Sequence, residues 1–203
     1  LLFVGKLDGW DEMKAGVPAG LPIIRLPLSA AAEGAAWDDI MARTPPLQGN
    51  PVRDGDELST IMYTSGTTGM PKGVMHSFAT FAWSMAAVRK RLESDEHSRI
   101  LSYLPLSHVA ERTVVEHNLL ASSLHVFFAE SLETFAADLQ RARPTVFFSV
   151  PRLWVKFQQG VLAKMPAQKL DRLLSIPLVR HVVRRKVLRA LGLDQCRFPA
   201  GGA

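Results

Sequence analysis

The sequence has little of what several classes of protein require. Its 203 residues contain one cysteine, Cys196. A lone thiol cannot form an internal disulfide and leaves too few thiolates for a zinc cluster, so a reducing, cytoplasmic location is expected. No apolar run approaches the roughly 20 residues of a membrane span. No basic start precedes an apolar core and a small-residue cleavage site, so a secretory leader is not predicted.

Acidic and basic residues balance each other outside one segment. The formal charge is +5, and five cations fall within ten residues: Arg180, Arg184, Arg185, Lys186 and Arg189. Without them the chain is neutral, so no nucleic-acid partner is predicted. Residues 178–191 have the pattern of a basic amphipathic helix. Such a helix could make peripheral contact with an anionic membrane surface, attract a phosphorylated ligand, or be the solvated face of an ordinary surface helix.

The overall composition is typical of a globular protein. Hydrophobic residues make up 47% of the chain and charged residues 21%, a balance that suits a packed core. A chain of this length can form one large core or two small ones. The sequence opens in an apolar segment without a methionine and stops at Gly201-Gly202-Ala203. We therefore expect a fragment of a longer protein.

Strand-like and helical stretches alternate along the chain. Strands are predicted at 1–5, 22–28, 58–63, 99–104, 124–129, 145–150 and 195–198. Helices are predicted at 10–15, 37–42, 78–92, 109–122, 132–141, 152–165, 169–174 and 178–191. Helices between successive strands indicate parallel strands with right-handed crossovers, so the predicted fold class is α/β, with βαβ units and a mostly parallel sheet. Residues 1–56 are expected to form the end of a first βαβ subdomain plus a linker, and residues 57–203 a second α/β subdomain.

A glycine-rich loop, I-M-Y-T-S-G-T-T-G-M-P-K-G at residues 61–73, follows one predicted strand. Residues 64–73 hold three glycines, four hydroxyls, one lysine and no acid. Glycines allow successive backbone N–H groups to turn inward, and such a nest, completed by hydroxyls and a lysine, binds anions. The apolar, extended segment 74–76 that follows makes the loop the tip of a hairpin. The loop is therefore predicted to bind a polyphosphate.

Two familiar phosphate-binding patterns do not fit this loop. Counted from Gly66, the second glycine of the Walker pattern falls on Pro71 and its Ser/Thr on Gly73. The dinucleotide pattern fails because two threonines separate Gly66 from Gly69. The segment is therefore a phosphate loop of another kind, with a flexible surface turn as the alternative interpretation.

Polar residues recur where the predicted strands end, which is where ligands bind in open α/β sheets. His108 follows the strand at 99–104, and its imidazole can stack, donate or accept near neutral pH; the alternative is a structural histidine that caps the next helix. Arg152 follows the strand at 145–150 and could meet a phosphate or carboxylate. It could equally pair with Glu130.

Three further polar residues lie in the predicted helix after His108. Glu111 and Arg112 are interpreted as an exposed helix start that carries its own ion pair. His117 shares a helical face with Val109 and Thr113 and is expected in the core rather than in a site.

Several segments together resemble the adenylate-forming (AMP-binding) superfamily. Residues 63–73 resemble its phosphate-loop signature, and residues 101–112 resemble its next motif in the form found in long-chain fatty acyl-CoA synthetases. Residues 143–145 and 149–152 resemble the segment that follows, and residues 201–203 the start of the adenine-binding motif. The resemblance covers residues 58–203. It implies part of the acyl-CoA synthetase N-terminal domain, truncated before the adenine motif is complete.

The resemblance implies an AMP-forming ligase with a fatty acid, ATP and CoA as substrates. The carboxylate would attack the α-phosphorus of ATP to give acyl-adenylate and pyrophosphate, and the thiol of CoA would then displace AMP. The catalytic residues would be Lys72 and His108, with His108 beside the acyl carboxylate and the α-phosphate. The β- and γ-phosphates would be held by Thr64, Ser65, Gly66, Thr67, Thr68, Gly69 and Lys72. Thr67 would also ligate Mg²⁺, and Gly201, Gly202 and Ala203 would line the adenine or ribose.

The sequence also departs from the pattern of the family. The acid that helps to hold Mg²⁺, the ribose-binding aspartate and the adenylation lysine of the C-terminal domain do not occur in it, so the chain alone is expected to be inactive. No aromatic matches the acyl-tunnel gate at 109–112, which leaves the acid open. The alternatives are an adenylating ligase for another carboxylic acid and a nucleotide-binding module without catalysis.

Overall fold

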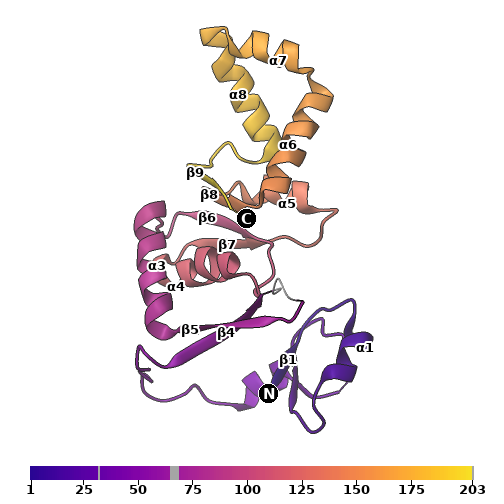
Figure 1. The fold of residues 1–203 in the computed structure, drawn as a ribbon, viewed down its shortest axis with the longest axis vertical. Helices are drawn as coiled ribbons and strands as arrows, with labels where there is room; N and C mark the ends of the chain where they lie inside the picture. Colours follow the sequence, from indigo (N-terminus) through magenta and orange to yellow (C-terminus); the bar gives the residue numbers. More distant parts are fainter. Residues whose placement is uncertain (32, 65–68, 203) are drawn as a thin grey trace. The chain divides into compact units, whose positions relative to one another are not determined.

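A computed structural model describes residues 1–31, 33–64 and 69–202 (Figure 1). The chain divides into two compact units, Leu1–Val52 and Arg53–Ala203. Both units combine strands with helices, and among the residues described every strand pair but one is parallel. The predicted α/β fold class with a mostly parallel sheet is therefore confirmed.

The first unit is a small three-stranded parallel sheet. Its order is β1-β2-β3, with Phe3 opposite Ile24 and Ile24 opposite Ala35. The ring of Phe3 meets Trp37 edge-on, with 6.1 Å between centroids. The elements are β1 (Leu2–Val4), α1 (Trp10–Met13), β2 (Ile23–Arg25), β3 (Ala35–Ala36) and α2 (Trp37–Arg43).

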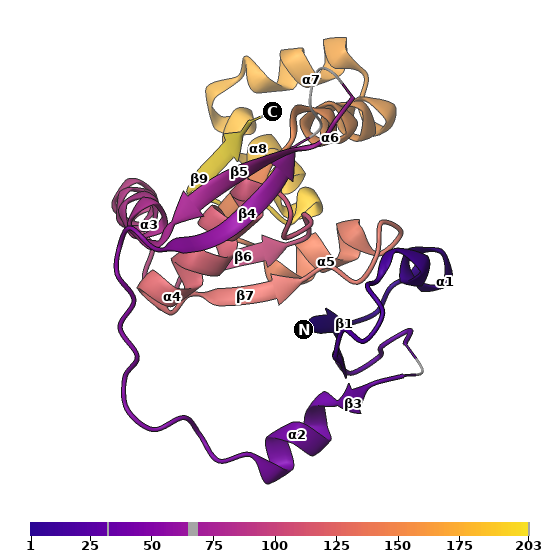
Figure 2. The same cartoon turned by 60° about the horizontal axis from the view of Figure 1, so that its bottom comes forward.

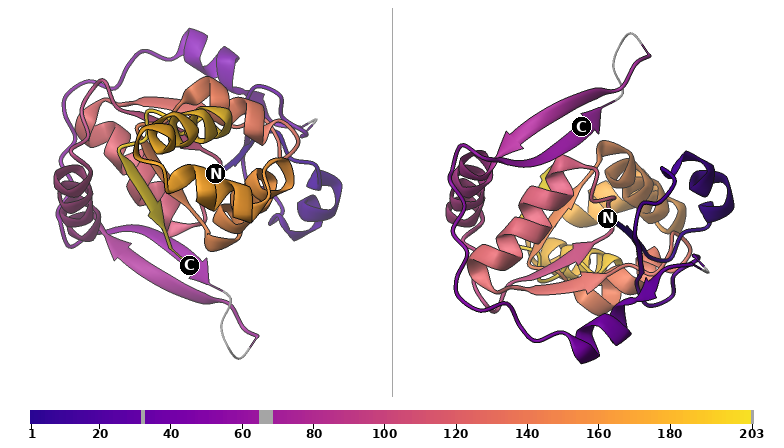
Figure 3. Two further views of the ribbon diagram at one scale, coloured as in Figure 1. Left: turned by 90° about the horizontal axis from the view of Figure 1, so that it is seen from above. Right: turned by 90° about the horizontal axis from the view of Figure 1, so that it is seen from below.

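The second unit begins with an antiparallel hairpin of β4 (Leu58–Thr64) and β5 (Lys72–Ser77), which lie side by side in Figures 2 and 3. Thr64 lies opposite Lys72 at the end of the hairpin that carries the connecting loop. This pairing confirms that the glycine-rich loop is the tip of a hairpin. Ser65, Gly66, Thr67 and Thr68, four of the predicted phosphate-binding residues, lie outside the described residues.

The helix after the hairpin, α3 (Phe78–Leu92), has the predicted bounds. The Ser77 hydroxyl begins it by accepting the N–H of Thr80 at 3.3 Å, a standard N-cap. The apolar spacing in this helix predicted one packed face, and Phe81 is buried. Helix α3 packs against the helical segment 111–122.

Two parallel strand pairs follow, β6 with β7 and β8 with β9. A helical crossover, a π-helical segment Glu111–His117 followed by α4 (Asn118–Ser122), connects β6 to β7. Helices α6, α7 and α8 form an arm that extends away from β8 and β9, with α7 at its far end (Figure 1). The remaining bounds are β6 (Arg99–Ser102), β7 (His125–Phe128), α5 (Phe135–Ala142), β8 (Val146–Ser149), α6 (Pro151–Lys164), α7 (Ala167–Leu174), α8 (Pro177–Leu191) and β9 (Phe198–Gly201). Within the described residues no helix is both long and apolar enough to cross a bilayer.

The last strand differs from the prediction. It was expected at 195–198, yet β9 starts at Phe198 and runs through Pro199 to Gly201. The prediction stopped at Pro199 because proline cannot donate to a strand ladder. In the structure β9 pairs with β8 alone, and proline is tolerated in such an edge strand.

The core of the second unit forms around β8. Phe147 is fully buried and packs with Leu101, Leu139, Ala142 and Leu193. The rings of Trp154 and Phe157 cover it, with centroids 5.5 and 6.2 Å from that of Phe147. Cys196 packs against the same cluster, and burial raises the pKa of its thiol.

Gly192 joins α8 to this core through a turn that only glycine fits well. Its φ of +77° is left-handed, the conformation that commonly ends a helix. A Cβ at this position would lie 2.6 Å from the carbonyl oxygen of Leu139 and 2.7 Å from the Cα of Gln140. The end of α8 and the backbone of α5 are therefore in direct contact at this residue.

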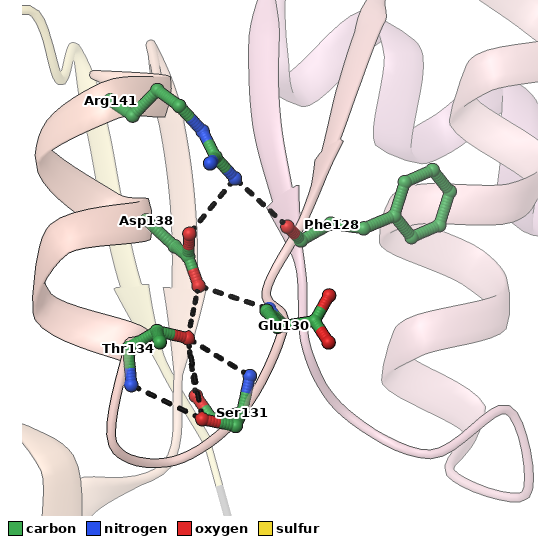
Figure 4. Close-up of polar contacts among 6 residues, drawn as sticks. All are labelled: Phe128, Glu130, Ser131, Thr134, Asp138 and Arg141. Atoms are coloured by element: carbon green, nitrogen blue, oxygen red, sulfur yellow. Dashed lines mark hydrogen bonds and ion pairs between the residues drawn. The ribbon is translucent and has the colours of Figure 1, made fainter. Parts of the chain in front are cut away.

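The turn after β7 is held by a buried carboxylate (Figure 4). Asp138 of α5 accepts the backbone N–H of Glu130 at 3.0 Å and the hydroxyl of Thr134 at 2.8 Å. Arg141 lies 2.9 Å from the same carboxylate. These donors hold the pKa of Asp138 below its usual value, the N–H of Glu130 most of all. Polar residues at this strand end thus close a turn.

Candidate functional site

A hollow of about 560 Å³ lies between the loop end of the hairpin and the loop after β6. This volume lies within the range of about 300–1,000 Å³ that is typical of small-molecule sites. None of the described residues that line it is acidic, which suits an anionic ligand. They are Met62, Tyr63, Thr64, Val74, His76, Pro105, Ser107, His108 and Val109.

The hairpin contributes Tyr63 and, mainly, one face of its two strands to the hollow. Successive side chains of a strand alternate between faces, so Met62 and Thr64 of β4 lie on the same face as Val74 and His76 of β5. The Thr64 hydroxyl donates to the carbonyl oxygen of Lys72 at 3.4 Å. By the same alternation Lys72 belongs to this face, and its side chain is exposed. The predicted phosphate-binding residues Thr64 and Lys72 therefore meet across the hairpin at the edge of the hollow.

His108 lies on the opposite side of the hollow, in the loop after β6. Its Nδ1 accepts the backbone N–H of Ala110 at 3.3 Å, and its carbonyl oxygen accepts the N–H of Glu111 at 3.1 Å. The histidine therefore does help to start the next helix, as the alternative interpretation held. Because Nδ1 is an acceptor, the neutral ring carries its proton on Nε2. That nitrogen can donate a hydrogen bond to an oxygen of a ligand.

The exposed helix start predicted at Glu111 and Arg112 is wrong for Glu111. This carboxylate is 2% exposed and accepts the Ser102 hydroxyl at 2.5 Å. Burial raises its pKa, while the Ser102 hydroxyl and the backbone N–H groups of Leu104 and Tyr103 oppose that rise. Arg112 pairs with Glu116 at 3.5 Å instead of with Glu111, and it donates to the carbonyl oxygen of Leu106 at 3.0 Å.

Together Glu111 and Arg112 fasten the loop that carries His108. Glu111 binds the end of β6, where the loop starts, and Arg112 binds Leu106 in its middle. Both residues belong to a π-helical segment, a form that is frequent at functional sites. The position of His108 therefore depends on the first turn of the helix that follows it.

The buried carboxylate leads to a pH-dependent prediction. The pKa of Glu111 is higher in the folded protein than in the unfolded chain. Its protonated form therefore contributes fully to the free energy of unfolding below the unfolded pKa of about 4.3. This contribution is lost as the pH rises through the folded-state pKa. We expect Glu111→Gln, which keeps the volume and stays neutral, to remove this loss. The difference between the urea midpoints of unfolding at about pH 5 and at about pH 8 should be larger for the wild type than for the variant.

A truncation at the same position serves as the control. Glu111→Ala leaves the Ser102 hydroxyl and the amides of Tyr103 and Leu104 without their acceptor, which is expected to destabilise the fold by about 1–3 kcal/mol. A wild type and a Glu111→Gln variant with the same pH dependence of unfolding would contradict the assignment of this titration to Glu111.

His76 was missed by the sequence prediction. It lines the hollow, and its ring lies 5.1 Å from the ring of Phe81, which in turn lies 4.2 Å from that of His117. The alternation of β5 could have identified it, because His76 is two residues from Val74 and four from Lys72. His117 has a buried Nδ1, and burial lowers its pKa. His117 is half-buried against Phe81 and does not line the hollow.

The remaining predicted site residues lie elsewhere or are not described. Gly201 ends β9 opposite Ser149, and a Cβ on it would lie 3.1 Å from the indole nitrogen of Trp154. Neither Gly201 nor Gly202 lines the hollow with Thr64 and His108. Gly69 has a left-handed φ of +80° in the loop. Ala203 lies outside the described residues, and Arg152 is exposed at the start of α6.

A metal site cannot be built from the described residues alone. No three His, Cys, Asp or Glu side chains among them come together as a metal cluster. The predicted Mg²⁺ ligand, Thr67, is outside the described ranges.

Comparison with known proteins shows the family. A family described as AMP-binding enzyme matches residues 14–192. The chain therefore belongs to the AMP-binding enzyme family, as the phosphate-loop signature predicted.

The curated relatives refine this assignment. The chain is 30% identical over 215 residues to the long-chain-fatty-acid–CoA ligase ACSBG2 of Homo sapiens, covering 88% of this chain and 32% of that protein. It is 34% identical over 173 residues to the corresponding ligase of Xenopus laevis, covering 70% of this chain and 23% of that protein. The chain thus spans about a third or less of the length of these relatives.

Solved structures support the fold. The adenylation domain of a carboxylic acid reductase from Segniliparus rugosus, in complex with AMP and a co-purified carboxylic acid, matches with a TM-score of 0.71 and 21% identity over 100% of this chain and 37% of that chain. The adenylation domain of a carboxylate reductase from Mycobacterium chelonae matches with a TM-score of 0.58 and 27% identity over 83% of this chain and 26% of that chain.

Proposed function

We propose that the protein containing this chain uses ATP to activate a long-chain fatty carboxylate and transfers the acyl group to CoA. The observation that carries the proposal is the hollow that joins Thr64, at the root of the glycine-rich loop, to His108. The names of the curated relatives support a long-chain acid and CoA as substrates. The cytoplasm, where ATP and CoA are available, is the proposed location.

The proposed reaction has two steps. A carboxylate oxygen attacks the α-phosphorus of ATP. The bond between this phosphorus and the oxygen that bridges it to the β-phosphate breaks, and pyrophosphate leaves with the electron pair. The sulfur of CoA then attacks the acyl carbon, AMP leaves, and the thiol proton is released to solvent. The first step is needed because a carboxylate becomes a good electrophile only when one oxygen is turned into a leaving group.

Residues of this chain would supply fixed donors for the first step. Lys72 and the loop 64–69 would bind the β- and γ-phosphates, where negative charge accumulates as pyrophosphate leaves. His108 would donate from Nε2 to an oxygen of the acyl carboxylate or the α-phosphate. Gly201, Gly202 and Ala203 would line the adenine or ribose. Thr67 would ligate Mg²⁺, which neutralises phosphate charge when bound.

The decisive test is pyrophosphate exchange into ATP by the protein at its full natural length. We expect labelled pyrophosphate to enter ATP in the presence of long-chain fatty acids, and AMP to be released when CoA is added. Short-chain and aromatic acids, assayed in the same way, are the comparison for the long-chain fatty acids. Absence of exchange with every acid would overturn the proposal.

An adenylating domain that serves an acceptor other than CoA is the second candidate. The 27% identity with the adenylation domain of a carboxylate reductase favours it. Both candidates share the exchange reaction, so the products separate them. Acyl-CoA formation supports the ligase, whereas exchange without thioester formation on CoA supports the second candidate.

A further inference from the structure

Helix α8 has a surface that the hollow does not use. In α7, α8 and the residues around them, 166–192, seven cations accompany one acid, Asp171. The excess of cations over acids in this segment is larger than the formal charge of +5 of the whole chain. None of the five cations of α8 forms an ion pair with another described residue. The charge of the chain is thus concentrated on the arm of α6, α7 and α8.

The structure separates the apolar residues of α8 into two groups. Val183 is buried, and Val179, Val187 and Leu191 are half-buried against the rest of the unit. Leu178, by contrast, is 85% exposed. Val182 has 67% of its surface in solvent, Ile176 before the helix has 44%, and Leu188 near the other end of α8 has 37%.

Leu178, Val182 and two of the cations share one stripe of the helix. Leu178, Val182, Arg185 and Arg189 are spaced four, three and four residues apart, which places them on the same face. This face, together with Ile176, is here called the basic face of α8. Its apolar end adjoins α7, at the end of the arm remote from β8 and β9 (Figure 1). The basic face therefore lies on a projecting part of the unit.

We propose that the basic face of α8 docks on the surface of an anionic lipid bilayer. Exposed leucine and valine can enter the boundary between headgroups and acyl chains, while arginine side chains bind the anionic headgroups. This inference does not depend on the ligase reaction. If both hold, docking brings the proposed enzyme to the place where long-chain acids concentrate.

Other occupants fit these residues less well. Single-stranded nucleic acids are bound through aromatic side chains that stack on bases, and residues 166–192 contain no Phe, Tyr or Trp. A protein groove for a helix selects apolar anchors along the full face, whereas on the basic face Leu178 and Val182 lie at one end and Arg185 and Arg189 at the other. If this face of α8 only met water, the joint exposure of the apolar residues Leu178 and Val182 would have no explanation.

Vesicle co-sedimentation of the protein at its full natural length tests the proposal. We expect binding to vesicles of phosphatidylcholine and phosphatidylserine in equal amounts, and little binding to phosphatidylcholine alone. The triple variant Arg185→Glu, Lys186→Glu and Arg189→Glu changes the two arginines of the basic face and the exposed lysine at its border. It should lower partition to the anionic vesicles about 100-fold, because each cation near the surface contributes to attraction. The double variant Leu178→Ser and Val182→Ser should lower it about tenfold.

A matched control carries the same charge changes elsewhere. Arg89→Glu, Lys90→Glu and Arg91→Glu alter three exposed cations in the last turn of α3 and should leave partition within about twofold of the wild type. Circular dichroism verifies that all variants are folded, and pyrophosphate exchange with a water-soluble acid should be unchanged in the α8 variants.

Three outcomes would overturn the proposal. They are no binding of the wild type to anionic vesicles, equal binding to both vesicle types, and equal loss in the α8 and α3 triple variants. Loss of exchange in every protein, with vesicle binding intact, would count against the ligase reaction and leave the membrane inference standing. The two proposals can therefore fail separately.

Discussion

Lys72→Ala is expected to slow adenylate formation by about 100- to 1,000-fold, the typical cost of removing one fixed donor from developing negative charge. Lys72 begins β5 and is exposed beside Thr64, so its charge would meet the leaving pyrophosphate. Its hydrogen bond with Thr64 uses the backbone carbonyl oxygen, which alanine keeps. Pyrophosphate exchange by the full-length protein measures the change.

The second half-reaction distinguishes this role from a general one. Thioester formation from preformed acyl-adenylate and CoA should change less than about tenfold, since pyrophosphate has already left. Lys72→Arg should retain part of the adenylation rate because it keeps the charge without the compact ammonium group. Lys90→Ala, in α3, is the surface control. Equal losses in both half-reactions would rule out placing Lys72 on the pyrophosphate.

Gly192→Ala is expected to destabilise the second unit by about 3–5 kcal/mol. Alanine is strained at φ +77°, and its Cβ would lie 2.6–2.7 Å from backbone atoms of Leu139 and Gln140. Backbone cannot move aside as a flexible side chain can, so α8 would have to shift from α5. Urea unfolding followed by circular dichroism measures the loss.

Gly160→Ala supplies the matched substitution. Gly160 lies within α6, and a Cβ there meets no atom within 4 Å. Alanine should therefore stabilise this helix by about 0.5–1 kcal/mol. If the two alanine variants unfold at the same urea concentration, the stability of the second unit does not depend on the close contact between Gly192 and α5.

The sequence predicted elements whose pattern is local. Helix α3 was placed correctly because its apolar residues repeat at helical spacing, and the hairpin because an apolar extended segment follows the glycine-rich loop. The π-helical segment 111–117 could not be predicted, since a single wider turn leaves almost no trace in apolar periodicity. It was read as an ordinary helix start.

The errors at the site have a common physical origin. Glu111 was expected in solvent because charged residues are usually exposed, yet a hydroxyl and two backbone amides from another element bind it. His76 was overlooked although the alternation of β5 places it on the same face as Val74, because nothing in the sequence marked that face as part of a site. Residues 199–201 were missed because proline within a strand is tolerated mainly at a sheet edge, and an edge position depends on how the strands pair. The cases of Glu111 and of residues 199–201 depend on contacts with other elements, which local patterns do not report.

The single thiol of the chain can serve as an internal reporter. Cys196 lies just before β9 and packs on the core cluster around Phe147, and burial raises its pKa. A neutral, covered thiol reacts slowly with alkylating reagents. Its alkylation rate therefore measures how often this part of the sheet opens, a quantity that global unfolding does not resolve. The local dynamics next to β9 can thus be followed without adding a label.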